Sequence, residues 1–172
     1  MDELERLSKE AFQQAEKSPL VVVLDNVRSM HNVGSVFRTC DAFLVEKIYL
    51  CGFTPTPPHR EIQKTALGAT ETVAWEATES TTDLIKELKN KGYQVYAVEQ
   101  THNSIALDGF TPTEKSKIAL VFGNEADGVN EEVIKCCDGA IEIPQFGSKH
   151  SFNISVSAGI VLWDIFNKSK IV

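Results

Sequence analysis

Long hydrophobic runs are missing from this chain of 172 residues, since no stretch approaches the ~20 uncharged apolar residues that a membrane-spanning helix requires. The first residues, Met-Asp-Glu-Leu-Glu-Arg, are too acidic for a secretory signal peptide. We therefore expect a soluble, cytoplasmic protein with no membrane partner. The length predicts a single domain, and 42% apolar residues are enough to fill one core.

Cysteine is scarce, and its arrangement does not suit a metal centre. Cys40, Cys51, Cys136 and Cys137 form no Cys-x-x-Cys pair, and no histidine stands at zinc-ligand spacing. Their neighbours are mostly apolar. We therefore expect reduced thiols, mostly in the core, and no bound metal.

An excess of basic charge is also missing, because 24 acidic and 17 basic residues give a net charge of −7. This balance argues against a protein that coats nucleic acid by bulk charge, but a local basic site remains compatible with it. The sequence has no Gly-x-x-x-x-Gly-Lys-Ser/Thr motif, and no Gly-x-Gly-x-x-Gly follows the first predicted strand. P-loop enzymes and ordinary dinucleotide dehydrogenases are therefore disfavoured.

Two kinds of apolar pattern alternate along the chain. Continuous apolar runs predict buried strands, and apolar positions three or four residues apart predict amphipathic helices. The predicted strands are residues 20–24, 47–51, 72–75, 93–98, 117–122 and 140–143. The predicted helices are residues 3–17, 32–43, 82–91, 131–136 and 153–167. This alternation predicts an α/β fold with a mostly parallel sheet flanked by helices.

Several local features sharpen this prediction. Asn32 can cap the second helix, on which Arg38 points away from the apolar stripe. Three prolines predict an irregular, exposed loop at 53–60. The last predicted helix, 153–167, is apolar on nearly all sides, so we expect other elements to enclose it.

Ligands of such folds bind outside the carboxyl ends of the strands, where three loops carry polar residues. Asn32, Gly34 and Arg38 stand at a helix N-terminus, where Arg28 and Arg38 could hold a phosphate. The alternative is an N-cap, a close-packing glycine and a solvated arginine. In the second loop, Glu125 lies between two glycines and either orients a ligand or belongs to a simple turn.

The third loop runs into the last helix. Ser151 and Asn153 either belong to a site or merely cap that helix, and Lys149 and His150 would then be solvated.

Together the three loops resemble the motifs of the SpoU (TrmH) branch of the SPOUT RNA methyltransferases. The matching residues, in order, are Asn32-x-Gly34-x-x-x-Arg38, Phe122-Gly123-Asn124-Glu125-x-x-Gly128 and Ile143-Pro144-x-x-Gly147-x-x-x-Ser151-Phe152-Asn153-x-Ser155-Val156-Ser157. Their order and spacing fit throughout, and the resemblance covers about residues 19–168.

The resemblance implies a deep trefoil knot, in which the C-terminal helix passes through a loop. It places an N-terminal helix at 1–18 and the knot and cofactor-binding region at about 117–168 of one domain, 1–172. It also implies that the knot loops bind S-adenosyl-L-methionine without a metal. The residues expected at the cofactor are Glu99, Gly123, Asn124, Ile143, Ser151 and Phe152.

The implied reaction moves a methyl group to a ribose 2′-hydroxyl, foremost of tRNA and alternatively of rRNA. That hydroxyl must lose its proton as it attacks, and Arg38 fills the place of the base by resemblance. Because a guanidinium with a pKa above ~12 accepts protons poorly, Arg38 acts either with an RNA phosphate or by stabilising the alkoxide. The other expected catalytic residues are Asn32, Glu125, Ser151 and Asn153.

A net negative chain must hold RNA through a local patch. The expected contacts, besides Arg38, are Arg28, His31, His59, Arg60, Lys64, Lys149 and His150. We also expect a homodimer, which would double this small basic surface. The alternatives of other classes are a non-catalytic RNA-binding module with the same fold and a small-molecule α/β enzyme that uses another nucleotide.

Overall fold

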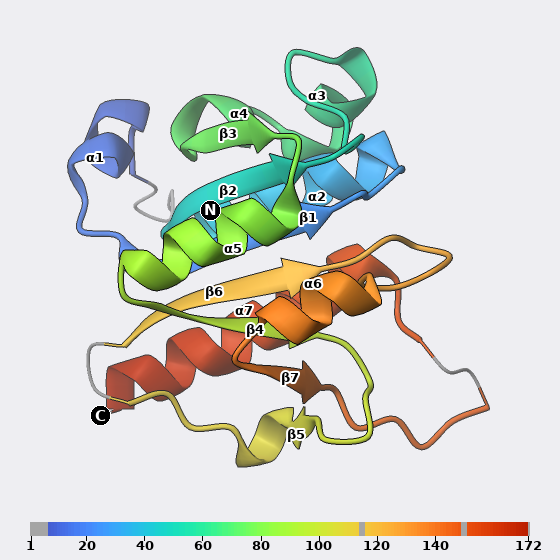
Figure 1. Ribbon diagram of the computed structural model, residues 1–172. Coiled ribbons are helices and arrows are strands. Elements are labelled where there is room, and N and C mark those ends of the chain that lie inside the picture. The colour runs from blue at the N-terminus through green and yellow to red at the C-terminus, as the bar shows by residue number, and fades with distance from the viewer. Residues whose placement is uncertain (1–6, 114–115, 149–150, 172) are drawn as a thin grey trace.

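The computed structural model describes residues 7–113, 116–148 and 151–171 (Figure 1). The described strands form one seven-stranded sheet with every neighbouring pair parallel, in the order β3-β2-β1-β6-β4-β7-β5. They are β1 (Ser18–Asp25), β2 (Val45–Cys51), β3 (Trp75–Thr78), β4 (Tyr93–Val98), β5 (Ile105–Ala106), β6 (Lys117–Phe122) and β7 (Gly139–Glu142). The predicted α/β fold with a parallel sheet is confirmed.

The centre of the sheet is formed by β1 and β6, whose residues Val22 and Leu120 are register partners and fully buried. Side chains of β1 alternate between the two faces. Val22 and Leu24 belong to one core cluster, and Val21 and Val23 belong to the other. A strand buried on both faces needs apolar residues at every position, which explains the continuous apolar runs in the sequence.

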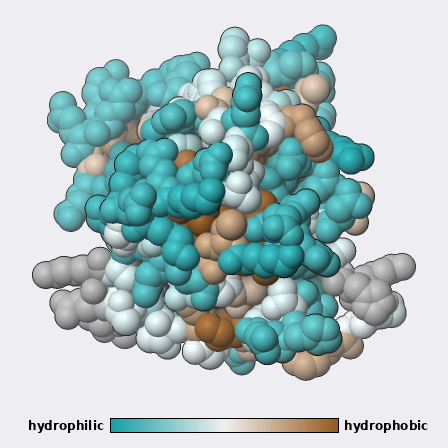
Figure 2. Space-filling view, viewed as in Figure 1, coloured by the Kyte–Doolittle hydropathy of each residue, from teal (hydrophilic) through white to brown (hydrophobic). Residues whose placement is uncertain are grey.

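Helices cover both faces of the sheet (Figure 1). Side chains of α1, α2, α3, α4 and α7 join one core cluster, whereas those of α5 and α6 join the other. The outer surface on the α5 and α6 side is mostly hydrophilic (Figure 2). The helices are α1 (Lys9–Gln14), α2 (Met30–Ala42), α3 (Arg60–Ala66), α4 (Ala69–Thr72), α5 (Thr81–Asn90), the 3-10 helix η1 (Leu107–Gly109), α6 (Glu131–Cys136) and α7 (Ile154–Ile171). Among the described residues, no helix combines the length and apolar character needed to cross a membrane.

Capping determines where the first two helices begin. Ser29 caps α2, because its side chain accepts a hydrogen bond from the Asn32 N–H at 3.3 Å. The prediction that Asn32 is the N-cap is therefore wrong. Ser8 caps α1 in the same way, so this helix is shorter than the predicted 3–17, of which residues 3–6 lie outside the described residues.

The region between β2 and α5 departs most from prediction. The predicted strand 72–75 is wrong, because Ala69–Thr72 form α4 and β3 begins only at Trp75. The proline-rich segment is irregular up to His59, as predicted, but Thr54 and Pro57 within it are buried. The helix α3, which follows the prolines, and the two-residue strand β5 were not predicted.

The last helix is buried on one side only. Ala158 and Val161 are fully buried, whereas Val156 is 47% and Trp163 57% exposed. The expectation that other elements enclose this helix is wrong within one chain, because α7 lies on an outer layer of the sheet (Figure 1). The knot that the family resemblance implies stays a prediction.

All four cysteines carry free thiols, as predicted. Cys40 and Cys51 are buried, and Cys136 and Cys137 are half-buried. Burial raises the pKa of Cys51 and of Cys137 to about 12, so both remain protonated at neutral pH.

Candidate active site

Two adjoining cavities lie at the carboxyl ends of β4, β6 and β7, and we call them together the strand-end cleft. They have volumes of about 80 and 150 Å³, and both are lined by Val98, Glu99, Phe152 and Ser157. Ile143 and Ser151 line only the first cavity. Gly123, Asn124, Glu125 and Asn153 line only the second. The cleft thus brings together all six residues expected at a cofactor.

A chain of hydrogen bonds joins the three motif loops at this cleft. The Asn153 side-chain amide donates to the Asn32 Oδ1 at 3.2 Å. The Asn32 amide in turn donates to Glu125 Oε1 at 2.9 Å. These residues lie 121 and 93 positions apart in the sequence, so only the tertiary fold creates this network.

The carboxylate of Glu125 occupies the N-terminus of α2. Its two oxygens accept the N–H groups of Arg28 and Ser29, each at 3.0 Å. Desolvation raises the pKa of Glu125, but the hydrogen bonds from Arg28, Asn32 and Ser29 outweigh it, and the pKa lies below its ordinary value. The predicted phosphate site at this helix N-terminus is therefore wrong, because the protein's own carboxylate fills it.

The loop from Gly123 to Gly128 is closed on itself. Asn124 and Gly128 exchange two backbone hydrogen bonds of 2.9 Å, and the Asn124 side chain accepts the Ala126 N–H at 2.8 Å. A Cβ atom at Gly123 would lie 2.1 Å from the Gly128 carbonyl carbon. Glycine at 123 therefore serves the packing of this loop first, rather than the close approach of a ligand.

Asn26, which the sequence patterns did not single out, ties neighbouring loops together. Its backbone has a left-handed conformation with φ of 55°, which asparagine tolerates better than most residues. Its carbonyl accepts the Asn124 side-chain amide at 2.8 Å, and its Oδ1 accepts the Phe53 N–H at 3.3 Å. The only sequence signal was its place directly after a buried strand.

The third loop reaches the cleft through the start of α7. The Asn153 Oδ1 accepts the Ser155 N–H at 2.9 Å, so Asn153 caps this helix and also joins the network. Ser151 is exposed at the rim of the cleft. Lys149 and His150 lie outside the described residues.

Glu99 contacts backbone rather than side chains. Its two carboxylate oxygens accept the N–H groups of Gln100 at 3.0 Å and of Val129 at 3.1 Å. A Cβ on Gly128, which has φ of 70°, would lie 2.3 Å from one of these oxygens. The side chain is therefore held beside the 123–128 loop, between the two cavities.

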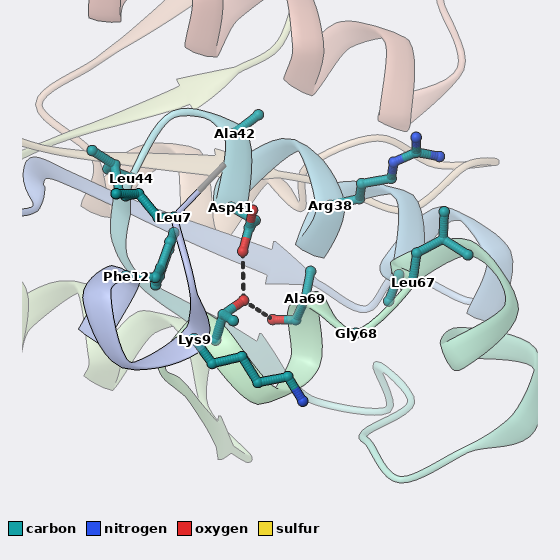
Figure 3. Close-up of a pocket in the computed structure, with 12 residues that line it drawn as sticks. Leu7, Lys9, Phe12, Arg38, Asp41, Ala42, Leu44, Leu67, Gly68 and Ala69 are labelled. Carbon is teal, nitrogen blue, oxygen red and sulfur yellow. Dashed lines mark hydrogen bonds between the residues drawn. The ribbon is translucent and has the colours of Figure 1, made fainter. Parts of the chain in front are cut away.

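Arg38 does not line the strand-end cleft. It is exposed on α2, about 1.7 helical turns and ~9 Å beyond Asn32 along the axis. It borders a separate groove of about 640 Å³ between α1, α2 and α4, beside Asp41 and Leu67 (Figure 3). The structure thus separates the expected catalytic arginine from the other expected site residues.

Of the described residues expected to bind RNA, four lie together and Arg28 lies apart from them. His31, His59, Arg60 and Lys64 gather around α3. There Glu61 pairs with Lys64 at 2.7 Å and His31 at 2.9 Å, and these contacts lower the pKa of the Glu61 carboxyl. Glu61 also binds His59 through its backbone N–H, which donates to the ring at 3.2 Å. Arg28 lies apart from them, with its guanidinium 5.8 Å from the centre of the Phe53 ring.

Metal ligands are not grouped at either place. Within residues 7–113, 116–148 and 151–171, no three His, Cys, Asp or Glu side chains are placed to hold an ion.

The parallel sheet and the three loops joined at its carboxyl edge define an α/β protein with a ligand site at the ends of its strands. The match of the sequence to a family model identifies the family. Residues 19–163 match the SpoU rRNA Methylase family, so the chain belongs to this family.

Two relatives illustrate the range of the family. The chain is 33% identical over 168 residues to the tRNA (guanosine(18)-2′-O)-methyltransferase of Aquifex aeolicus, a match that covers 94% of this chain and 74% of that enzyme. It is 30% identical over 154 residues to the 23S rRNA (guanosine-2′-O-)-methyltransferase RlmB of Neisseria meningitidis serogroup B, which covers 90% of this chain and 60% of RlmB.

Solved structures agree with this assignment. The crystal structure of the A. aeolicus TrmH/SpoU tRNA modifying enzyme has a TM-score of 0.82 at 28% identity and covers 95% of this chain and 81% of that one. An AdoMet-bound rRNA methyltransferase from Sinorhizobium meliloti has a TM-score of 0.78 at 27% identity, with 92% and 60% covered.

Proposed function

We propose that this protein transfers a methyl group from S-adenosylmethionine to a ribose 2′-hydroxyl of tRNA. The observation that carries the proposal is the hydrogen-bonded network of Asn32, Glu125 and Asn153, which unites the three family motifs beside one cleft. The names of the relatives divide between tRNA and rRNA, so rRNA is the alternative substrate. The alternative of another class is a non-catalytic RNA-binding module with the same fold, which would bind RNA without transferring a methyl group.

The strand-end cleft has the chemistry that S-adenosylmethionine requires. Val98, Ile143 and Phe152 offer apolar walls for an adenine ring, and Glu99 and Ser151 offer polar groups at its edges. We assign the adenosyl contacts to the backbone at Gly123, Ile143 and Phe152 and the remaining contacts to Glu99, Asn124 and Ser151. When bound, this cofactor supplies an electrophilic methyl group. The AdoMet-bound rRNA methyltransferase from Sinorhizobium meliloti supports this choice of cofactor.

The role of the chain's own residues is to orient the ribose and to stabilise charge. Asn32, Glu125 and Asn153 hold the loops rigid, and Ser151 stands at the rim for contact with the ribose. The guanidinium of Arg38 stays charged, so we assign it the stabilisation of the forming alkoxide. The alternative is that an RNA phosphate beside Arg38 takes up the proton of the hydroxyl.

Because Arg38 and the cleft lie apart in one chain, we infer a homodimer in which each cleft is completed by Arg38 of the second copy. The exposed apolar side of α7, with Val156 and Trp163, suits such an interface. The face covered by α5 and α6 does not, because it is mostly hydrophilic (Figure 2). Each copy then forms a single methyltransferase domain, with the knot and cofactor-binding region at about 117–168.

The RNA contacts are assigned to the basic residues near the carboxyl edge of the sheet, with Lys149 and His150 included from the sequence. Glu61 neutralises part of the positive charge around α3 through its contacts with His31 and Lys64. The affinity for RNA should therefore be low and should fall further as the salt concentration rises.

The proposal is tested with methyl-labelled S-adenosylmethionine and total RNA from cells that lack the protein. Label should enter RNA at a 2′-O position of one nucleotide, which mapping of the labelled RNA identifies. The matched control is Ser157→Tyr, which fills the cleft from α7 and should abolish incorporation. A wild-type protein that binds the cofactor but labels neither tRNA nor rRNA would refute the proposal.

A further inference from the structure

Phe53 is an exposed aromatic residue on an anchored backbone. It follows β2 at the same edge of the sheet as the strand-end cleft, and 63% of its surface is exposed. Its N–H donates to Asn26 Oδ1 at 3.3 Å. The next residue, Thr54, is buried and donates to the Cys51 carbonyl at 2.7 Å while accepting the Val27 N–H at 3.1 Å. The fold therefore presents this ring to solvent and does not use it in the core.

A cation lies beside the ring. The Arg28 guanidinium is 5.8 Å from the ring centre and 4.0 Å from Asp127. The backbone of Arg28 is fixed independently of its side chain, because its N–H is bound by Glu125. A long contact to a single carboxylate leaves most of the five guanidinium donors of Arg28 available to a ligand.

Between these side chains lies a cavity of about 220 Å³. Phe53 and Arg28 line it, together with Asp127 and Asn130. It also shares Asn124 and Gly128 with the strand-end cleft, so the closed turn between them forms a common wall. The Asn130 Oδ1 accepts the Glu132 N–H at 2.9 Å, and the NH₂ group of the same amide is not used in this bond. Asp25 and Asn26 complete the lining, and Asp25 Oδ1 already accepts the Thr81 hydroxyl at 2.6 Å. An aromatic face, a guanidinium, two carboxylates and several amides thus surround one small space.

We propose that this cavity holds one unpaired base of the RNA substrate, stacked on Phe53, with Arg28 beside its phosphate. The inference rests on the proposed function and names how the RNA is held. Single-stranded bases are typically bound by stacking on aromatic rings and arginine planes, while amide and carboxylate groups bind their edges. Asp127 accepts hydrogen bonds only, so it favours a base edge that carries amino or imino donors.

The test compares Phe53→Leu, which keeps apolar bulk but removes the aromatic face, with Phe53→Trp, which keeps a face for stacking. Methyl transfer to total undermethylated RNA is measured for both. Phe53→Leu should lower kcat/KM at least about tenfold, mainly through KM, the scale seen when a stacking ring is lost. Phe53→Trp should stay within about threefold of wild type on the same argument. The matched control is Ile105→Ala, an exposed apolar residue on the edge strand β5, which should behave as wild type.

A second measurement separates a base from a phosphate. Fluorescein-labelled single-stranded oligoadenylate is compared with the same ribose-phosphate chain without bases. Phe53→Leu should weaken binding of the oligoadenylate and leave binding of the base-free chain unchanged. Equal weakening of both, no weakening of either, or equal impairment of the leucine and tryptophan variants would overturn the inference.

The two proposals fail separately. An active wild type with an equally active Phe53→Leu variant refutes the stacking site and leaves the methyltransferase assignment intact. A wild type without transfer activity, whose oligoadenylate binding still depends on Phe53, refutes the proposed function alone. Cofactor titration and thermal melting of each variant confirm that it is folded.

Discussion

Glu125→Gln removes one charge at the N-terminus of α2 while preserving the size of the side chain. The carboxylate accepts the N–H groups of Arg28 and Ser29 at 3.0 Å and the Asn32 amide at 2.9 Å. Glutamine has one acceptor oxygen in place of two, so at least one N–H loses its partner. The attraction between the carboxylate and the helix dipole is lost as well.

The expected loss of stability is moderate because Glu125 is exposed. A hydrogen bond to a charged group contributes ~1.5–3 kcal/mol when buried, and water replaces part of that here. We take about 1 kcal/mol for the bond and about 0.5 kcal/mol for the helix dipole. For a chain of this length, a total of about 1.5 kcal/mol lowers Tm by about 3–6 °C.

The effect must depend on pH in one direction. Hydrogen bonds in the folded protein lower the pKa of Glu125 below its ordinary value. Its stabilisation is therefore fully present above the ordinary pKa and is lost as the pH falls through the folded pKa. The difference in Tm between wild type and Glu125→Gln should be constant from about pH 8 to 6, shrink once the pH falls below the ordinary carboxyl pKa, and close as the pH falls through the lower folded pKa.

Thermal unfolding followed by circular dichroism across this pH range measures both effects. Asp127→Asn is the matched control, since it removes a charge from the same exposed loop without removing a bond to the α2 N-terminus. Its Tm should change by less than about 2 °C. A Glu125→Gln protein that melts like wild type at pH 7, or a difference in Tm that shrinks at no pH below the ordinary carboxyl pKa, would refute the assigned role of the carboxylate.

Further predictions concern the cleft, the arginine and the interface. Arg38→Ala should melt within about 2 °C of wild type and bind S-adenosylmethionine normally, yet lose at least ~100-fold in single-turnover transfer; early melting would make Arg38 structural. Gly123→Val should lower Tm together with cofactor affinity in calorimetry, because its Cβ would lie 2.1 Å from the Gly128 backbone, and a normal Tm would contradict this contact. Trp163→Glu should yield only 19.0 kDa monomers in sedimentation, and a persistent dimer would place the interface elsewhere. Co-expression of Arg38→Ala with Ser157→Tyr should restore about one quarter of wild-type activity, since half of the dimers are mixed and one of their two sites is intact; mixed dimers without activity would exclude a site shared between copies.

The sequence predicts the central strands well because their environment leaves few alternatives. Tyr93–Val98 and Lys117–Phe122 form strands at the predicted positions, and each is bounded by a residue that favours a turn or carries a charge. The edge strand β3 was misplaced because its residues are half-buried or exposed, so that no continuous apolar run marks it. Its actual start follows from α4, which is held by the Thr72 hydrogen bond to Asp41 across to α2.

The sequence predicted which loops form the candidate site, but it did not predict which side chains in them form hydrogen bonds with one another. A parallel sheet places all carboxyl ends at one edge, so polar residues after buried strands were expected to meet there. The partner of Glu125 was not predictable, because its hydrogen bonds span 96 and 97 residues. A free backbone N–H at a helix N-terminus attracts any anion, and only the fold shows that the anion is a side chain of the same protein.

The position of Arg38 follows from helix geometry. It lies six positions after Asn32, so the two side chains point ~120° apart around α2 and lie ~9 Å apart along it. Asn32 faces Glu125 and Asn153, and Gly34 fixes the helix against α3, where a Cβ would lie 2.2 Å from the Ile62 carbonyl oxygen. The spacing of the motif therefore places Asn32 and Arg38 on two different surfaces of one helix. This separation is the reason for the proposed homodimer, in which Arg38 of a second copy would complete the cleft.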